Sequence, residues 1–140
     1  MEEILDGAKL LALIIRSDFR ADGIIFATPD DFSQQLGYMN RPKGYEIKPH
    51  RHNLNARTVE FTQETLFVRN GKLRVDFFTD EQEYVKSAIL LSGDVVLLAT
   101  GGHGFEMLEQ SEIIEVKQGP YNSDKDKIQF RGIEKSKIKL

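Results

Sequence analysis

Three histidines and one glutamate are spaced along this chain in a pattern that suits metal binding. His50 and His52 lie two residues apart behind Pro49, and successive side chains on an extended strand point to opposite faces. Both imidazoles of this His-x-His pair then point the same way, so one strand can supply two metal ligands. Glu64 follows on a run rich in Thr, Val and Phe, and His103 lies in a later glycine-rich turn. The chain has no further histidine, and the sequence predicts a His/His/Glu/His site.

The carboxylate and the metal of this site both have alternatives. Alternation along residues 58–68 would place Glu60 on the same face as Glu64, so Glu60 is the competing carboxylate. Three imidazole nitrogens and one carboxylate oxygen form a borderline donor set that suits Zn, Fe, Mn, Co or Ni. Ligand type alone does not choose among these metals, and open coordination positions would remain for water or a substrate.

Short strands separated by turns are expected to position these residues. Apolar runs at 10–15 and 23–27 predict two N-terminal strands, and Thr28-Pro29-Asp30-Asp31 predicts a short helix over residues 30–36. Further strand patterns, besides the histidine strand, cover residues 58–68, 72–78, 84–91, 95–99, 105–109 and 113–117. Many short strands with turn signals between them, at a spacing of roughly 8 to 12 residues, are typical of a β-sandwich or barrel.

Two finer predictions concern pairing and burial in this series of strands. Asn70-Gly71 separates two strand patterns and is a hairpin signal. Residues 72–78 alternate, with Leu73, Val75 and Phe77 on one face and Lys72, Arg74 and Asp76 on the other. This alternation predicts a strand that is buried on one face only.

The stretch from Gly44 to Gly71 resembles the first motif of the cupin superfamily. That motif is a glycine, five residues, His-x-His, a short spacer, a glutamate, six residues and a glycine, and both flanking spacings are present here. The region from Gly93 resembles the second motif, in which Gly-Asp opens a strand and a histidine follows a glycine-containing turn. The chain departs from the family in its spacer of eleven residues between His52 and Glu64, where three or four are usual. Ala99 and Met107 also replace the usual proline and asparagine, and the glycine turn is one residue short.

The resemblance implies an all-β fold, a single-domain cupin-type β-barrel of the double-stranded β-helix or jelly-roll kind, to which the short N-terminal helix is added. We expect one domain over residues 1–140. Its parts would be N-terminal strands and helix over 1–43, a barrel core over 44–118 and a polar C-terminal tail over 119–140. The resemblance also implies one divalent first-row metal (Zn, Fe, Mn, Ni or Co) held by His50, His52, Glu64 and His103.

Composition excludes several classes of function. A chain of 140 residues that is 40% hydrophobic and 29% charged is typical of one soluble globular domain. The net charge of −3 argues against a nucleic-acid-binding surface, which is usually basic. With no cysteine, no disulfide, thiolate zinc site or cysteine nucleophile can form. The apolar run at 10–15 is too short for a signal peptide or a membrane span, so we expect a cytoplasmic protein without membrane contact.

Residues around the predicted site are candidates for binding and proton transfer. Arg41, Lys43 and Arg57 carry positive charge that an anionic substrate would need, because guanidinium groups bind carboxylate and phosphate in a bidentate manner. Gln63 is a candidate for lining the same cavity. Glu60 and Tyr38 are the candidates for moving a proton.

We therefore expect a metal-dependent enzyme that acts on a small polar anionic metabolite, sugar-derived, by isomerase- or epimerase-type chemistry. This expectation draws on a resemblance to small cupins associated with bacterial surface-polysaccharide synthesis. The alternatives are a metal-dependent dioxygenase, a non-catalytic ligand-binding or sensing cupin, and a metal-free cupin that uses histidines as acid and base. We also expect a homodimer, because residues 10–15 with the outward-facing Phe61 and Phe67 supply more apolar surface than one small barrel readily covers.

Overall fold

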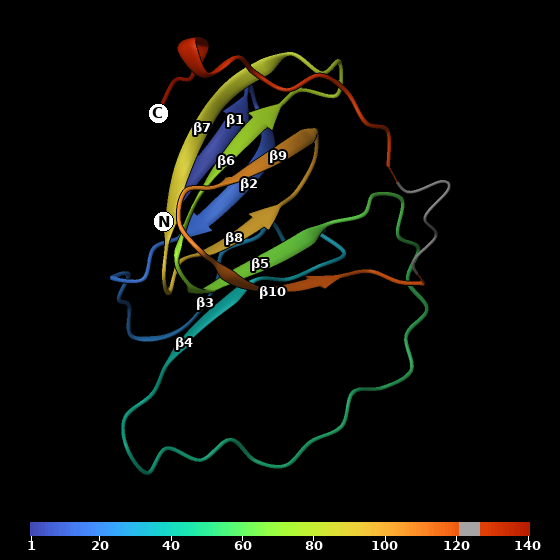
Figure 1. Ribbon diagram of the computed structural model, residues 1–140. Helices are drawn as coiled ribbons and strands as arrows, with labels where there is room; N and C mark the ends of the chain where they lie inside the picture. The colour runs from blue at the N-terminus through green and yellow to red at the C-terminus, as the bar shows by residue number, and fades with distance from the viewer. Residues whose placement is uncertain (121–126) are drawn as a thin grey trace. The chain divides into compact units, whose positions relative to one another are not determined.

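The computed structural model describes residues 1–120 and 127–140, and this part of the chain is all-β. It contains ten strands in three antiparallel sheets and one 3-10 turn, η1 (Lys135–Lys137) (Figure 1). The predicted all-β class is confirmed. The described residues form separate sheets of five, three and two strands, with no closed barrel among them. They also contain no helix that is long and apolar enough to cross a membrane.

The chain divides into two compact units. The core unit consists of Met1–Phe19 and Phe61–Leu140, and the insert unit consists of Arg20–Glu60. In the core unit, the five-stranded sheet has the order β1-β2-β8-β5-β10 and the three-stranded sheet has the order β7-β6-β9. Their bounds are β1 (Glu2–Asp6), β2 (Lys9–Ile15), β5 (Glu64–Asn70), β6 (Lys72–Phe78), β7 (Tyr84–Leu91), β8 (Val95–Leu98), β9 (Gly102–Met107) and β10 (Glu112–Lys117).

The hydrophobic core lies between the two sheets of the core unit. The five-stranded sheet contributes side chains from β1, β2, β5 and β8, and the three-stranded sheet contributes side chains from β6 and β7. Leu73, Val75 and Phe77 on β6 are almost fully buried, as their alternation predicts. Removing such side chains from water stabilises the fold by about 1.5 to 3 kcal/mol each. The apolar strand β2 is also buried, so residues 11–15 do not provide the exposed surface that the dimer prediction partly rests on.

The chain passes from one sheet to the other at Asn70-Gly71, so the predicted hairpin there is wrong. Strand β5 pairs with β8 and β10, whereas β6 pairs with β7 and β9. Gly71 has a positive φ of 97°, and a Cβ at this position would overlap the carbonyl oxygen of Gln110. The glycine therefore allows a sharp change of sheet rather than a two-residue hairpin.

Strand β6 is buried on both faces, contrary to the prediction of one exposed face. Arg74 and Asp76 are buried on the face opposite the core. The C-terminal segment, residues 127–140, contacts this outer face, and the Ser87 N–H on β7 donates to the Lys139 carbonyl over 2.7 Å. In Figure 1 this red segment runs beside β7. Part of the predicted polar tail thus packs on the core unit, while its residues 121–126 lie outside the described part of the chain.

The insert unit contains a small antiparallel pair, β3 (Gly23–Phe26) and β4 (Gly37–Asn40). The helix predicted over residues 30–36 does not form, and turns and bends occupy that segment. The Gln35 side-chain amide donates to the Pro29 carbonyl, and the Leu36 N–H donates to the Thr28 hydroxyl. Local bonds between side chains and backbone compete in this way with the regular hydrogen bonds of a helix.

Residues 41–63, all of which the structure describes, contain no strand. The predicted histidine strand therefore does not form, and the strand predicted to begin at residue 58 begins only at Glu64. A segment that favours extended backbone forms a β-strand only beside another strand. Without one, the backbone N–H and C=O groups of this segment face solvent, and Pro49 has no N–H to donate. Glu60 consequently does not share a strand face with Glu64.

Candidate functional site

Glu64 and His103 lie in contact at one end of the core unit. Glu64 is the first residue of β5 and shares its inward face with Leu66 and Val68, which belong to the core. His103 on β9 is paired with the buried Phe77 on β6, so it also faces inward. Its Nε2 lies 3.2 Å from the Glu64 carboxylate oxygen Oε2. Two of the four predicted metal ligands are thus brought together from opposite sheets.

The electrostatic surroundings keep Glu64 ionised. The hydrogen bond from His103 is the main cause that lowers the pKa of Glu64 below its ordinary value, and Lys117 also contributes. Burial opposes this effect, since only 6% of Glu64 is exposed. Lys117 reaches the site because β10 pairs with β5 in a register that sets Lys117 opposite Glu64. Its Nζ lies 3.5 Å from Glu64 and 2.7 Å from Glu115.

This pair opens into a pocket of about 550 Å³ within the core unit, a size that suits a small-molecule ligand. Its lining combines charged side chains with aromatic rings: Glu64, His103, Lys117 and Lys127, and Phe78, Phe105 and Phe130. Gly101, in the turn before β9, and Gly102 and Gly104 at the start of β9 also line it. Gly101 has a φ of 70°, and a Cβ there would overlap the carbonyl oxygen of Phe78, so the close approach of this turn to β6 requires glycine.

His50 and His52 lie in the insert unit and are exposed. Their ring centroids are 5.4 Å apart and the rings are inclined at 80°. The His50 Nδ1 lies 2.9 Å from the Lys48 carbonyl oxygen. Because a carbonyl only accepts hydrogen bonds, Nδ1 is the donor in this contact, and in the neutral ring Nε2 then has the lone pair. This is the arrangement that metal-binding histidines commonly adopt, with the second ring nitrogen donating to a backbone carbonyl.

One distance between two predicted ligands can be compared with metal geometry. Two ligands at about 2.1 Å from one first-row metal are about 3.0 to 3.4 Å apart, and the His103 to Glu64 distance of 3.2 Å falls in this range. Among the residues that the structure describes, no group of three or more histidine and carboxylate side chains could hold a metal. Each unit thus carries half of the predicted donor set, Glu64 and His103 in one and His50 and His52 in the other.

Most of the other predicted site residues also belong to the insert unit. Tyr38 lies on β4 opposite Ile25, and the Arg41 guanidinium stacks over the Tyr45 ring at 4.6 Å from its centroid. Lys43, Arg57 and Glu60 are exposed. Gln63, in the core unit, is buried just before Glu64, and its backbone N–H donates to the Gln118 side chain over 2.7 Å.

The pocket residues that were not identified from the sequence include Lys117, Lys127 and Phe130. Lys117 reaches Glu64 only through the register between β5 and β10, a long-range pairing that local sequence patterns do not reveal. Lys127 and Phe130 lie in the polar tail. Phe130 and the isoleucines of that largely polar tail were the available signals of packing.

Comparisons with known protein families, curated proteins and solved structures find no match for this chain.

Proposed function

We propose that this protein is a cupin-type, jelly-roll protein that binds one divalent first-row metal through His50, His52, Glu64 and His103. Its pocket would bind a small, polar, anionic metabolite derived from a sugar, and the reaction would be of the isomerase or epimerase type. The contact between Glu64 and His103 carries this proposal. It joins a glutamate and a histidine that the sequence motifs single out independently, and it lies in a pocket of suitable size.

The order of strands in the core unit supports a jelly-roll type of fold. From β5 onward, successive strands move repeatedly between the two sheets: β5, β8 and β10 belong to the five-stranded sheet, and β6, β7 and β9 belong to the three-stranded sheet. Jelly rolls are two-sheet antiparallel folds of this kind, and larger members enclose ligand cavities. Glu64 and His103 lie on the inward faces at the open end, where such a fold would place a ligand.

The chain's own residues provide charge and proton-transfer groups for this chemistry. A bound divalent metal would supply a Lewis acid that polarises a carbonyl or hydroxyl oxygen. Lys117 and Lys127 line the pocket, where Lys117 already pairs with Glu64 and Glu115, and Lys127 supplies a second positive charge that favours an anionic ligand. Arg41, Lys43 and Arg57 remain proposed additional anion contacts, and Glu60 and Tyr38 remain proposed proton carriers.

A second candidate function is metal-free acid–base catalysis, and the same contact favours it. If the His103 Nε2–H donates to the Glu64 carboxylate, the Nδ1 of the neutral ring keeps a lone pair that can accept a proton. An oriented imidazole beside an ionised carboxylate is a common general base. Metal retention distinguishes this function from the first.

The proposal is tested by elemental mass spectrometry on protein purified without an affinity tag. We expect about one first-row metal per chain, and its identity separates redox from Lewis-acid chemistry. His50→Ala and His103→Ala should each lose most of the metal while keeping the β-sheet circular dichroism of the wild type. Arg69→Ala, which removes an exposed ion pair with Glu112, is the matched control and should retain the metal. Wild-type protein that stays metal-free after incubation with these metals would rule out the first function and leave the second.

A further inference from the structure

The C-terminal segment, residues 127–140, forms one wall of the pocket and will be called the strap. It contributes five residues to the pocket lining: Lys127, Ile128, Gln129, Phe130 and Gly132. Ile128 is 81% exposed although it lines the pocket, so its apolar side chain is available for a ligand to cover. The strap belongs to neither sheet.

Phe130 is seated in a site that fits its ring. It packs edge-on against Phe78, with the ring centroids 5.1 Å apart. A Cβ on Gly102 would lie 2.6 Å from the Phe130 Cζ, so only glycine leaves room for the ring here. The strap is therefore docked at its start by one aromatic side chain at the ends of β6 and β9.

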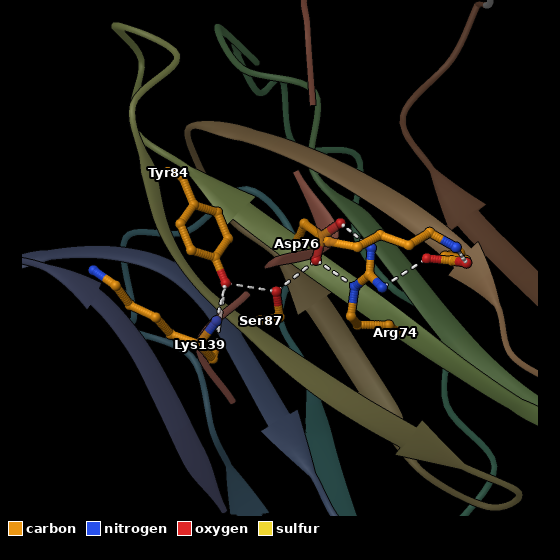
Figure 2. Close-up of polar contacts among 7 residues, drawn as sticks. Arg74, Asp76, Tyr84, Ser87 and Lys139 are labelled. Atoms are coloured by element: carbon orange, nitrogen blue, oxygen red, sulfur yellow. Dashed lines mark hydrogen bonds and ion pairs between the residues drawn. The ribbon is translucent and has the colours of Figure 1, made fainter. Parts of the chain in front are cut away.

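A polar latch holds the other end of the strap on the outer face of the three-stranded sheet (Figure 2). The Lys139 N–H donates to the Tyr84 hydroxyl over 2.8 Å, and the Ser87 hydroxyl donates to Asp76 over 2.5 Å. Because Ser87 gives its one hydroxyl proton to Asp76, Tyr84 is the donor in their 2.8 Å contact, and the Lys139 carbonyl at 3.2 Å competes for the same Tyr84 proton. Arg74 then pairs with Asp76, so a continuous chain of hydrogen bonds links the strap to a buried ion pair.

Between the ring and the latch, the strap is tied to β9 by one ion pair. Lys135 donates to Glu106 over 2.5 Å, and Glu106 also accepts from Arg74 over 2.6 Å. Lys135 itself is largely exposed. The strap has no strand pairing and most of its residues are exposed, so we expect it to open at a lower free energy than the sheets.

We infer that the strap is the closing wall of the pocket and selects ligands that carry an anionic group beside an apolar face. Lys127 would meet the anionic group together with Lys117, and Phe130 and Ile128 would cover the apolar face. The inference rests on the proposed function only in treating the pocket as a ligand site. His103 lines the same pocket and its side chain is 29% exposed, so opening of the strap should expose it further.

The first test measures access to His103 by diethyl pyrocarbonate modification of chelator-treated protein, with each histidine followed by peptide mass spectrometry. The exposed His50 and His52 are internal references. Phe130→Ala empties the aromatic seat, and Tyr84→Phe removes only the hydroxyl of the latch. Both should raise the modification rate of His103 about three- to tenfold and leave the rates of His50 and His52 unchanged. Lys137→Ala lies in the strap but pairs with Glu134 in the strap itself, so it is the matched control and should behave as the wild type.

The second test measures protection of His103 by two probes, inorganic phosphate and phenyl phosphate. Phenyl phosphate should protect His103 at a concentration about tenfold lower than inorganic phosphate does, because its ring would be buried against the strap. Lys127→Ala should weaken protection by both probes, and Ile128→Ser should remove the advantage of the ring. Equal protection by both probes, or by neither, would overturn the inferred ligand class. A His103 that already reacts as fast as His50 and His52 in the wild type, or a rate unchanged in both strap variants, would overturn the closing role.

Discussion

The sequence identified two residues of the pocket, Glu64 and His103. Both were identified by their motif spacings, and both lie in the pocket at 3.2 Å from each other. Glu60, identified only by alternation, has no strand on which to alternate. The same motif spacing also identified His50 and His52, which lie in the insert unit and whose part in the site stays a prediction. Alternation holds only while the chain remains in a sheet. The pocket lysines Lys117 and Lys127 were missed because their contacts depend on long-range packing.

Asp76 should control the acid stability of the core unit. Burial alone would raise the pKa of Asp76, but hydrogen bonds from Arg74 and Ser87 outweigh it and hold the pKa below the ordinary value of 3.8. A carboxyl with a lowered pKa in the folded state stabilises the fold above its unfolded pKa. That contribution is lost as the pH falls below 3.8 and through the folded pKa.

Asp76→Asn leaves the buried Arg74 with only Glu106 as an ionised partner, and should cost about 3 kcal/mol at pH 7. Urea unfolding at several pH values measures this difference, which should shrink below about pH 4 as wild-type Asp76 becomes protonated. A variant as stable as the wild type at pH 7 would show that the buried ion pair contributes nothing. A difference that persists unchanged at pH 2 would show that charge is not its cause.

At the level of elements, the positions of the strands were predicted better than their partners. The patterns at 72–78 and 84–91 match β6 and β7 in position. The turn at Asn70-Gly71 was placed correctly, yet it connects two sheets instead of two paired strands. Turn residues report a local change of direction, and the sheet that receives the next strand is decided by burial over the whole unit. The strap over Arg74 and Asp76 was missed for the same reason.

Gly71 should be one of the most sensitive positions in the connection between the sheets. Gly71→Ala forces a side chain into a positive-φ conformation and against the Gln110 carbonyl, and should destabilise the fold by at least about 2 kcal/mol. Gly104→Ala is the control, because a Cβ there meets no atom within 4 Å, and its cost should stay within about 1 kcal/mol. Equal unfolding midpoints for the two variants in urea would contradict the role given to Gly71.

At the level of the whole molecule, one exposed apolar row supports the predicted homodimer. Phe67 on β5 is paired with Ile114 on the edge strand β10, and Val116 lies on the same outward face. All three are more than 40% exposed. Exposed apolar rows on an edge strand tend to be covered by a partner.

Light scattering should therefore give a dimer mass at micromolar concentration. In a symmetric dimer through this row, Val116→Lys would place a positive charge from each chain in the apolar interface. It should raise the dimer dissociation constant at least about tenfold. Leu91→Lys makes the same change on β7, at a residue that is similarly exposed, and should leave the dimer intact. A monomer mass for the wild type, or equal effects of the two lysines, would contradict a dimer through this row.

The proposed metal site of His50, His52, Glu64 and His103 is tested most directly at the metal itself. Glu64 and His103 belong to the core unit, and His50 and His52 belong to the insert unit. X-ray absorption at the edge of the bound metal counts its ligands directly. The proposal predicts three imidazoles and one carboxylate at about 2.0 to 2.2 Å, and the loss of one imidazole in His103→Ala. A spectrum with one or two imidazoles in the wild type, or one unchanged in His103→Ala, would contradict it.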